Sequence, residues 1–146
     1  PEKISNHYIL DFDKERQYSE EMAKEMHTKC ASVMEDVGNL SGGNMQKVLL
    51  GKWLFAEPEI LILDEPTRGI DVGAKYEIYC TINKMVAEGK SVIMISSEMP
   101  EILGMCDRIY VMNEGKMIAE MDGKSATQEK IMTEIINSGK SNNLGV

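Results

Sequence analysis

An acidic pair at the end of an apolar run is the first feature that could carry chemistry. Asp64 and Glu65 directly follow residues 60–63, a short apolar run typical of a buried parallel strand. A carboxylate at that place can hold Mg²⁺ through water, and its neighbour can orient or deprotonate a water in line with a phosphate. The end of a strand followed by the start of a helix gives the same pattern, so the pair alone leaves both interpretations open.

A second run that could carry chemistry consists of Ser41, Gly42 and Gly43. It lies at the start of an expected helix that ends near Phe55, before Pro58. Backbone amides that carry no side chains bind anions at a helix N-terminus, where the helix dipole also favours negative charge. The alternative is an ordinary loop in which Ser41 caps the helix. The order of anion loop, helix, strand and acidic pair is more specific than either run by itself.

A third polar run follows the apolar residues 92–95 and consists of Ser96, Ser97 and Glu98. Ligands of α/β proteins gather at the carboxyl ends of the strands. We therefore expect a site at the ends of the two apolar strands.

The elements that position these runs alternate between helix and strand, which predicts an α/β domain with a parallel sheet. Periodicity predicts an amphipathic helix from about Asp13 that ends before Cys30, and a helix that begins at Asp71 and has Gly89 as its left-handed C-cap. Residues 31–40 are expected to form a loop. Further predictions are a strand at 92–95, a short helix at 100–105, a hairpin of strands at 108–112 and 116–120, and a last helix with Ser125 and Gln128 as capping box.

The apolar pattern also predicts which faces are buried. We expect the strand at 60–63 to be covered on both faces. The helix after Ser41 carries Met45, Leu49 and Trp53 on one face. The expected buried side of the helix after Asp71 consists of Val72, Tyr76, Tyr79, Ile82 and Val86.

Composition narrows the classes of function. The chain has 146 residues, a net charge of -8 and 42% hydrophobic residues, enough for one buried core. The acidic balance, without clustered Lys and Arg, argues against a nucleic-acid partner. The three cysteines are far apart and lack metal-binding spacing, so we expect reduced thiols. No apolar run approaches the ~20 residues needed to cross a bilayer.

The motifs together resemble those of ATP-binding-cassette (ABC) proteins. The run LSGGNMQKV at residues 40–48 looks like their signature loop, and ILILDEP at residues 60–66 looks like their Walker B strand. The run TRGID at residues 67–71 resembles the D-loop. The stretches at 65–75 and 95–101 are similar to the second cassette of tandem ATPases that power sugar uptake of the galactoside and ribose type.

The resemblance implies a role for each motif in ATP hydrolysis with Mg²⁺, performed by two cassettes that face each other head to tail. Ser41, Gly42 and Gly43 would contact the γ-phosphate of ATP held by the partner cassette, and Gln46 would belong to the same nucleotide-binding signature. Asp64 would assist Mg²⁺ binding, Glu65 would act as general base, and Asp71 would couple the two sites. Other implied partners are a membrane permease and a sugar-binding protein, which places the protein at the cytoplasmic face of a bacterial membrane.

ATP and Mg²⁺ are thus the expected ligands, with Asp64 holding the metal through water.

Three departures from the family pattern bear on these roles. No GxxxxGK[ST] phosphate loop occurs in the 146 residues, so we expect the chain alone to bind ATP weakly and to hydrolyse essentially none. Ser97 takes the switch position, where many cassettes have His, and a hydroxyl cannot supply a cationic contact to the γ-phosphate. Met45 stands where the sugar-importer signature usually has Gln, a change that the flanking Asn44 and Gln46 make tolerable.

The expected organisation is a partial ABC ATPase domain of the P-loop NTPase class without its phosphate-loop half. Residues 1–12 have uncertain structure, 13–40 form part of a helical subdomain, 41–139 form the C-terminal part of the ATPase core, and 140–146 form a frayed tail. We also expect the fragment to self-associate through uncovered apolar sheet surface. Two alternatives remain open: a soluble ABC-type ATPase of DNA repair or translation, and a non-catalytic interaction module.

Overall fold

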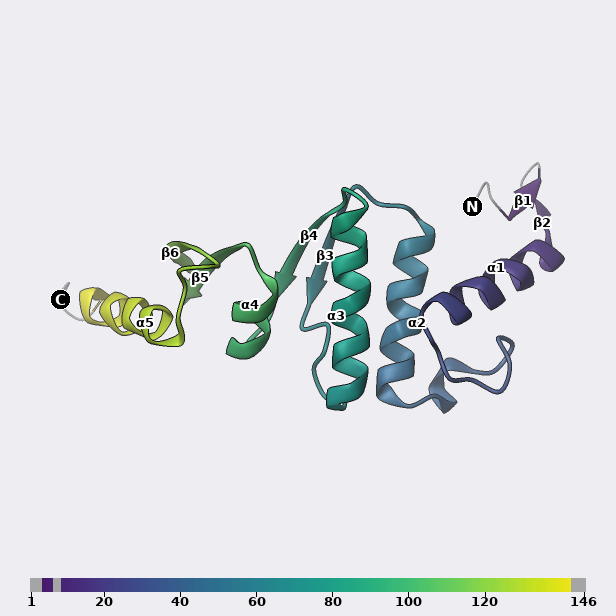
Figure 1. Ribbon diagram of the computed structural model, residues 1–146, viewed down its shortest axis with the longest axis horizontal. Helices are drawn as coiled ribbons and strands as arrows, with labels where there is room; N and C mark the ends of the chain where they lie inside the picture. The colour runs from purple at the N-terminus through teal and green to yellow at the C-terminus, as the bar shows by residue number, and fades with distance from the viewer. Residues whose placement is uncertain (1–3, 7–8, 143–146) are drawn as a thin grey trace. The chain divides into compact units, whose positions relative to one another are not determined.

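The computed structural model describes residues 4–6 and 9–142 (Figure 1). The chain divides into two units, Pro1–Ile93 and Met94–Val146, and each is described here by itself. The domain boundaries expected from the sequence stay predictions. Within the described ranges, no helix is both long and apolar enough to cross a membrane.

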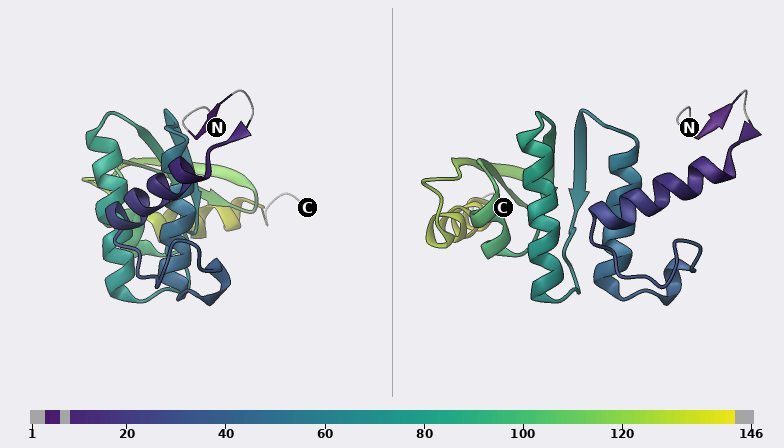
Figure 2. Two further views of the ribbon diagram at one scale, coloured as in Figure 1. Left: turned by 90° about the vertical axis from the view of Figure 1, so that its right-hand side faces the viewer. Right: turned by 45° about the vertical axis from the view of Figure 1, so that its right-hand side comes forward.

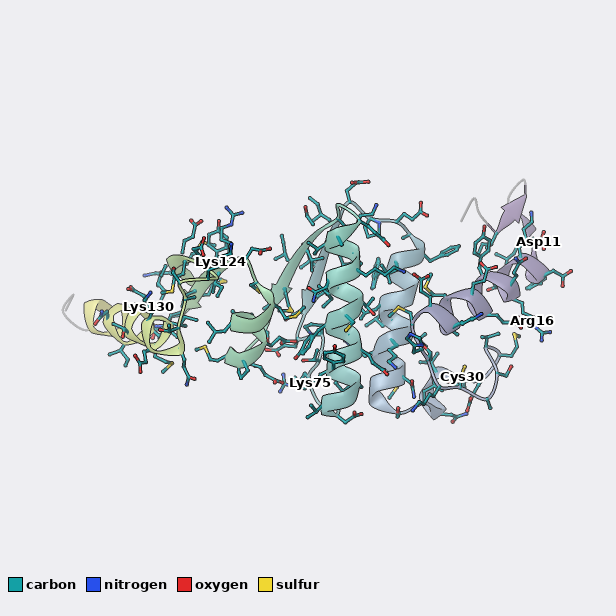
Figure 3. All side chains as sticks on the ribbon, in the orientation of Figure 1. Asp11, Arg16, Cys30, Lys75, Lys124 and Lys130 are labelled. Carbon is teal, nitrogen blue, oxygen red and sulfur yellow. The ribbon has the colours of Figure 1, made fainter. Side chains whose placement is uncertain are left out.

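The first unit begins with a short hairpin and a helix. Strands β1 (Ser5–Asn6) and β2 (Ile9–Leu10) pair in antiparallel fashion, in the segment whose structure the sequence left uncertain. Helix α1 (Phe12–Glu25) follows, and its N-cap residue Asp11 accepts a hydrogen bond from the backbone N–H of Lys14 at 3.1 Å (Figure 3). The amphipathic helix predicted from about Asp13 is therefore confirmed.

Two helices and a strand form the body of the first unit. They are α2 (Gly42–Phe55), β3 (Ile60–Asp64) and α3 (Val72–Ala87), preceded by a 3-10 turn at Val37–Asn39. Helix α1 crosses α2 (Figure 2), and the rings of Tyr18 and Phe55 meet edge to face at 5.5 Å. The backbone of Gly89 has φ 89°, which confirms the left-handed C-cap expected after α3.

Helix α3 buries only part of the stripe that the sequence predicted: Ile82 is buried as expected, at 5% exposed. Ile78, Ile82 and Met85 are buried, and Ile78 is 0% exposed. Val72, Tyr76 and Val86 of the predicted stripe are exposed, and Val72 is 83% exposed. The prediction was wrong for these three residues because α3 carries two apolar stripes, and the stripe that packs in this unit starts at Ile78.

Helix α2 shows the same difference. Its buried residues include Lys47, Leu50 and Gly51, whereas the apolar face of Met45, Leu49 and Trp53 is exposed. The face that α2 turns toward its neighbours is therefore defined by small and aliphatic residues and one lysine.

Strand β3 is buried on one face only, so the prediction of a strand covered on both faces was wrong. Leu61 and Leu63 are buried, while Ile60 and Ile62 are 61% and 63% exposed. Strand β4 (Ser91–Ile95) is the neighbour of β3 in a two-stranded sheet. The backbone N–H of Ser91 donates to the carbonyl of Glu59 at 2.9 Å, so the two strands begin side by side. With α3 as the crossover between them, this is a parallel β-α-β arrangement (Figure 1).

The second unit contains the end of β4, helix α4 (Met99–Met105), strands β5 (Arg108–Asn113) and β6 (Lys116–Asp122), and helix α5 (Gln128–Asn142). Strands β5 and β6 pair in antiparallel fashion around Gly115, whose φ is 74°. This confirms the predicted hairpin. Its core consists of Ile109, Val111 and Ile131, so α5 packs on the hairpin.

The start of α5 corrects a predicted cap. The backbone N–H of Lys130 donates to the hydroxyl of Thr127 at 3.3 Å, so Thr127 caps the helix. The hydroxyl of Ser125 instead donates to the carbonyl of Asp122 at 3.2 Å. The helix continues to Asn142, and residues 143–146 of the predicted tail lie outside the described residues.

Candidate functional site

Two helix starts meet at one end of the first unit. Helices α2 and α3 both begin there, and the loop that follows strand β3 runs to the same end (Figure 1). The contacts between these segments agree, because a Cβ atom on Gly43 would lie 2.7 Å from the Cβ of Ala74 and 3.8 Å from a carboxylate oxygen of Asp71. The structure thus brings the run at 41–43 against the first turn of α3. Figure 3 shows Lys75 near the same end of α3, which adds a cationic side chain.

Gly42 and Gly43 differ in what the fold demands of them. A Cβ atom at Gly43 would clash with Ala74, so close packing of α2 on α3 requires glycine there. A Cβ atom at Gly42 would lie 3.7 Å from Ile70, which is ordinary van der Waals contact. The packing of the chain therefore explains Gly43 but does not require a glycine at position 42.

Ser41 stands at the N-cap position of α2, as predicted, but its side chain makes no capping bond. Its hydroxyl accepts a hydrogen bond from the side-chain amide of Asn44 at 2.9 Å. The carbonyl oxygen of the same Asn44 side chain accepts from the backbone N–H of Lys29 at 2.9 Å. Ser41 is thus held by a side-chain network, and the first-turn amides of α2 receive no bond from its hydroxyl. Gln46 lies farther along α2 and is half-buried.

The acidic pair ends β3 as predicted, with an unusual backbone at its second residue. Asp64 is exposed, and Glu65 has φ 48°, in the left-handed region that residues other than glycine rarely adopt. Glu65 also precedes the buried Pro66, which restricts its backbone further. Backbone conformations of this kind cost free energy and cluster at active sites. The carbonyl of Glu65 accepts from the N–H of Arg68 at 3.2 Å and closes the turn.

Asp71 caps helix α3. One of its carboxylate oxygens accepts from the backbone N–H of Ala74 at 3.0 Å. That hydrogen bond holds the pKa of the Asp71 carboxyl below its ordinary value, and the positive charge of Lys47 acts in the same direction. Asp71 therefore keeps its negative charge at the shared end of α2 and α3.

The second unit holds the third polar run. Ser97 is exposed and lies between β4 and α4. Its neighbour Ser96 accepts a hydrogen bond from the backbone N–H of Glu98 at 3.0 Å, and the Ser96 hydroxyl donates to the carboxylate of Glu101. Glu101 is 3% exposed. The turn that carries Ser97 is therefore anchored to a buried carboxylate.

Sequence reasoning missed two buried charged residues, Lys47 and Glu101. Both side chains belong to types that are almost never fully buried unless paired, so periodicity assigns them to the surface. The only sign of their burial in the sequence was that each lies between the apolar positions of a helix.

The acidic pair fits a magnesium site only in part. Among residues 4–6 and 9–142, no three His, Cys, Asp or Glu side chains gather closely enough to hold a metal ion. Mg²⁺ in phosphate-transferring enzymes needs one or two carboxylates, with waters and phosphate oxygens as its other ligands. The exposed Asp64 matches that smaller requirement.

The known proteins to which this chain is similar are ATP-binding proteins of transporters. The family model described as ABC transporter matches residues 3–68. The L-arabinose transport ATP-binding protein AraG of Geobacillus stearothermophilus is 60% identical over 130 residues, which are 89% of this chain and 25% of that protein. The ribose import ATP-binding protein RbsA of Bacillus cereus is 50% identical over 131 residues, 90% of this chain and 26% of that protein. The chain thus spans about a quarter of the length of the curated relatives it matches.

Solved structures share the fold. An ATP-binding cassette of an ABC transporter, MJ1267, has a TM-score of 0.69 at 24% identity, over 81% of this chain and 48% of that one. The dimeric bacterial ABC transporter cassette MJ0796 has a TM-score of 0.70 at 20% identity, over 84% of this chain and 52% of that one. The family match, the sugar-import relatives and the shared fold agree. This chain therefore belongs to the ABC transporter family, and it covers part of one ATP-binding cassette.

Proposed function

We propose that the chain is the C-terminal part of an ATP-hydrolysing subunit that powers sugar import through a membrane permease. The names of the arabinose, xylose and ribose import relatives support the substrate class. The single observation that carries the chemistry is the meeting of the start of α2 with the start of α3 and with the loop that leads from the acidic end of β3 (Figure 1).

Each candidate residue then has a role in ATP hydrolysis. The backbone amides at Ser41, Gly42 and Gly43 bind the γ-phosphate of ATP that the partner cassette holds, because a helix N-terminus favours an anion. Gln46 supports that loop from the next turn of α2. Bound Mg²⁺ neutralises the charge that develops on the phosphates.

The acidic residues act on the metal and the water. Asp64 binds Mg²⁺ through a water molecule, and Glu65 accepts the proton of the attacking water. Asp71 lies beside Gly43 and keeps its charge, so it can couple the two nucleotide sites across the interface between cassettes.

The subunit needs a partner cassette because these residues form only part of a nucleotide site. We place it at the cytoplasmic face of the membrane, docked on a permease that receives sugar from a binding protein. Ser97 takes the switch position and offers no cation to the γ-phosphate. The site that uses β3 and β4 of this chain is therefore the slower of the two.

Gly42→Asp in the complete subunit tests this function. A carboxylate at position 42 repels the γ-phosphate, so we expect a loss of ATP turnover by about a hundredfold or more, as for the removal of one preorganised anion contact. Gly42→Ala fits the fold and adds a methyl group without a charge, so it separates the effect of bulk from the effect of charge. It should leave the melting temperature unchanged and lower turnover less than Gly42→Asp does.

Gly139→Asp is the matched control, because the same substitution in α5 meets no atom within 4 Å. It should leave the steady-state ATPase rate unchanged. Wild-type turnover in Gly42→Asp would show that the loop does not face nucleotide, and the proposed function would be wrong.

A further inference from the structure

Lys47 is a buried lysine on the same helix as the candidate anion loop. It is 4% exposed, although it carries a charge that is costly to remove from water. Lysine is almost never fully buried unless it is paired. Its burial therefore requires specific partners, and those partners show which parts of the chain it joins.

The partners of Lys47 come from two other segments. Its Nζ atom donates to the backbone carbonyl of His27, just after α1, at 3.0 Å. It also forms an ion pair with the carboxylate of Glu77 on α3. The hydrogen bond from Lys47 is the main reason why the pKa of Glu77 lies below its ordinary value. One ammonium group thus joins the end of α1, helix α2 and helix α3.

The ion pair lies in the same helix interface as the close contact at the candidate site. Gly43 and Lys47 are four residues apart on α2, and Ala74 and Glu77 are three apart on α3, so each pair shares a helix face. The Gly43–Ala74 contact and the Lys47–Glu77 pair are therefore successive layers between α2 and α3.

We propose that Lys47 is a positioning residue that fixes the anion loop at 41–43 relative to the loop at 67–71, through its ion pair with Glu77. This inference rests on the proposed function, since it assigns a role within the same ATPase site. Lys47 itself does not touch nucleotide. It holds two loops in the geometry that hydrolysis needs and ties that geometry to the end of α1.

The exposure of the two partners predicts an asymmetry between their substitutions. The side chain of Glu77 is 44% exposed, so water can solvate its carboxylate when Lys47 is replaced. Replacement of Glu77 instead leaves the buried ammonium with the carbonyl of His27 as its one hydrogen-bond partner among the described residues, which is the more costly change. Removing both charges together should therefore be better tolerated than removing Glu77 alone.

The test compares Lys47→Met, Lys47→Arg, Glu77→Gln and the double variant Lys47→Met/Glu77→Gln in the complete subunit. We expect Lys47→Met to lower kcat for ATP by about tenfold or more, because small displacements of binding groups cost large factors in rate. The Kd for Mg-ATP should stay unchanged, and Lys47→Arg should keep most of the turnover. The double variant should turn over faster than Glu77→Gln.

Lys84→Met is the matched control. Lys84 pairs with Glu25 and so also joins α3 to α1, but both side chains are half exposed or more. Its kcat should equal that of the wild type. A wild-type kcat in Lys47→Met would overturn the inference, and so would a double variant slower than both single variants. If Lys47→Met does not fold, the turnover of Glu77→Gln is compared with that of the double variant. A double variant that is no faster than Glu77→Gln would then overturn the inference. Failure of Gly42→Asp to lower turnover would instead overturn the proposed function.

Discussion

At the residue scale, the structure separates a glycine that packing requires, Gly43, from one that packing does not require, Gly42. The sequence located Ser41, Gly42, Gly43 and the acidic pair, because residue type and spacing carry that information. It could not show that Gly43 faces Ala74 across a helix interface, since that contact depends on how α2 packs on α3. It also missed Lys47, because a buried charge is recognisable only through its partners.

Gly43→Ala tests the packing at this scale. Its new methyl group would lie 2.7 Å from the Cβ of Ala74, and overpacking of this kind costs about 1–3 kcal/mol of unfolding free energy. Ala74→Gly removes the opposing methyl group, so the double variant should be more stable than the sum of the two single effects predicts. Urea unfolding measures all three variants. Strictly additive free energies would show that the two residues do not meet.

At the element scale, periodicity predicted the existence and type of most elements but not all of their buried faces. The helices, the hairpin and the strand before Asp64 are confirmed. The errors fall on α2, α3 and β3, where apolar residues such as Trp53, Val72 and Ile60 are exposed. An apolar stripe shows that a face can be buried, whereas the neighbouring elements decide whether it is.

Gly123→Ala tests the turn after strand β6. A Cβ atom at Gly123 would lie 1.9 Å from the backbone carbonyl oxygen of Cys106, and backbone cannot move aside as a flexible side chain can. We expect a loss of about 2 kcal/mol or more in urea unfolding, at the upper part of the range for overpacking. Gly104→Ala is the control, since nothing lies within 4 Å of that position in α4. Equal stability of the two variants would contradict this close approach.

At the scale of the whole molecule, the chain spans only part of the length of the proteins to which it is similar. It covers 48% of the cassette MJ1267 and 25% of the arabinose transport protein to which it is similar. The exposed Ile60 and Ile62 on β3 are the physical basis for the self-association expected from the sequence, which stays a prediction. In the proposed function the chain contributes the loop at 41–43 and the acidic strand end, and its 146 residues contain no GxxxxGK[ST] phosphate loop.

The most direct test of this account is a structure of the complete subunit with Mg²⁺ and a non-hydrolysable ATP analogue. The account predicts that backbone amides at Ser41, Gly42 and Gly43 lie within hydrogen-bond distance, about 2.7–3.2 Å, of γ-phosphate oxygens held by the opposite cassette. Asp64 and Glu65 should face the nucleotide bound by their own cassette. A γ-phosphate that contacts neither the loop at 41–43 nor the end of β3 would contradict the central claim.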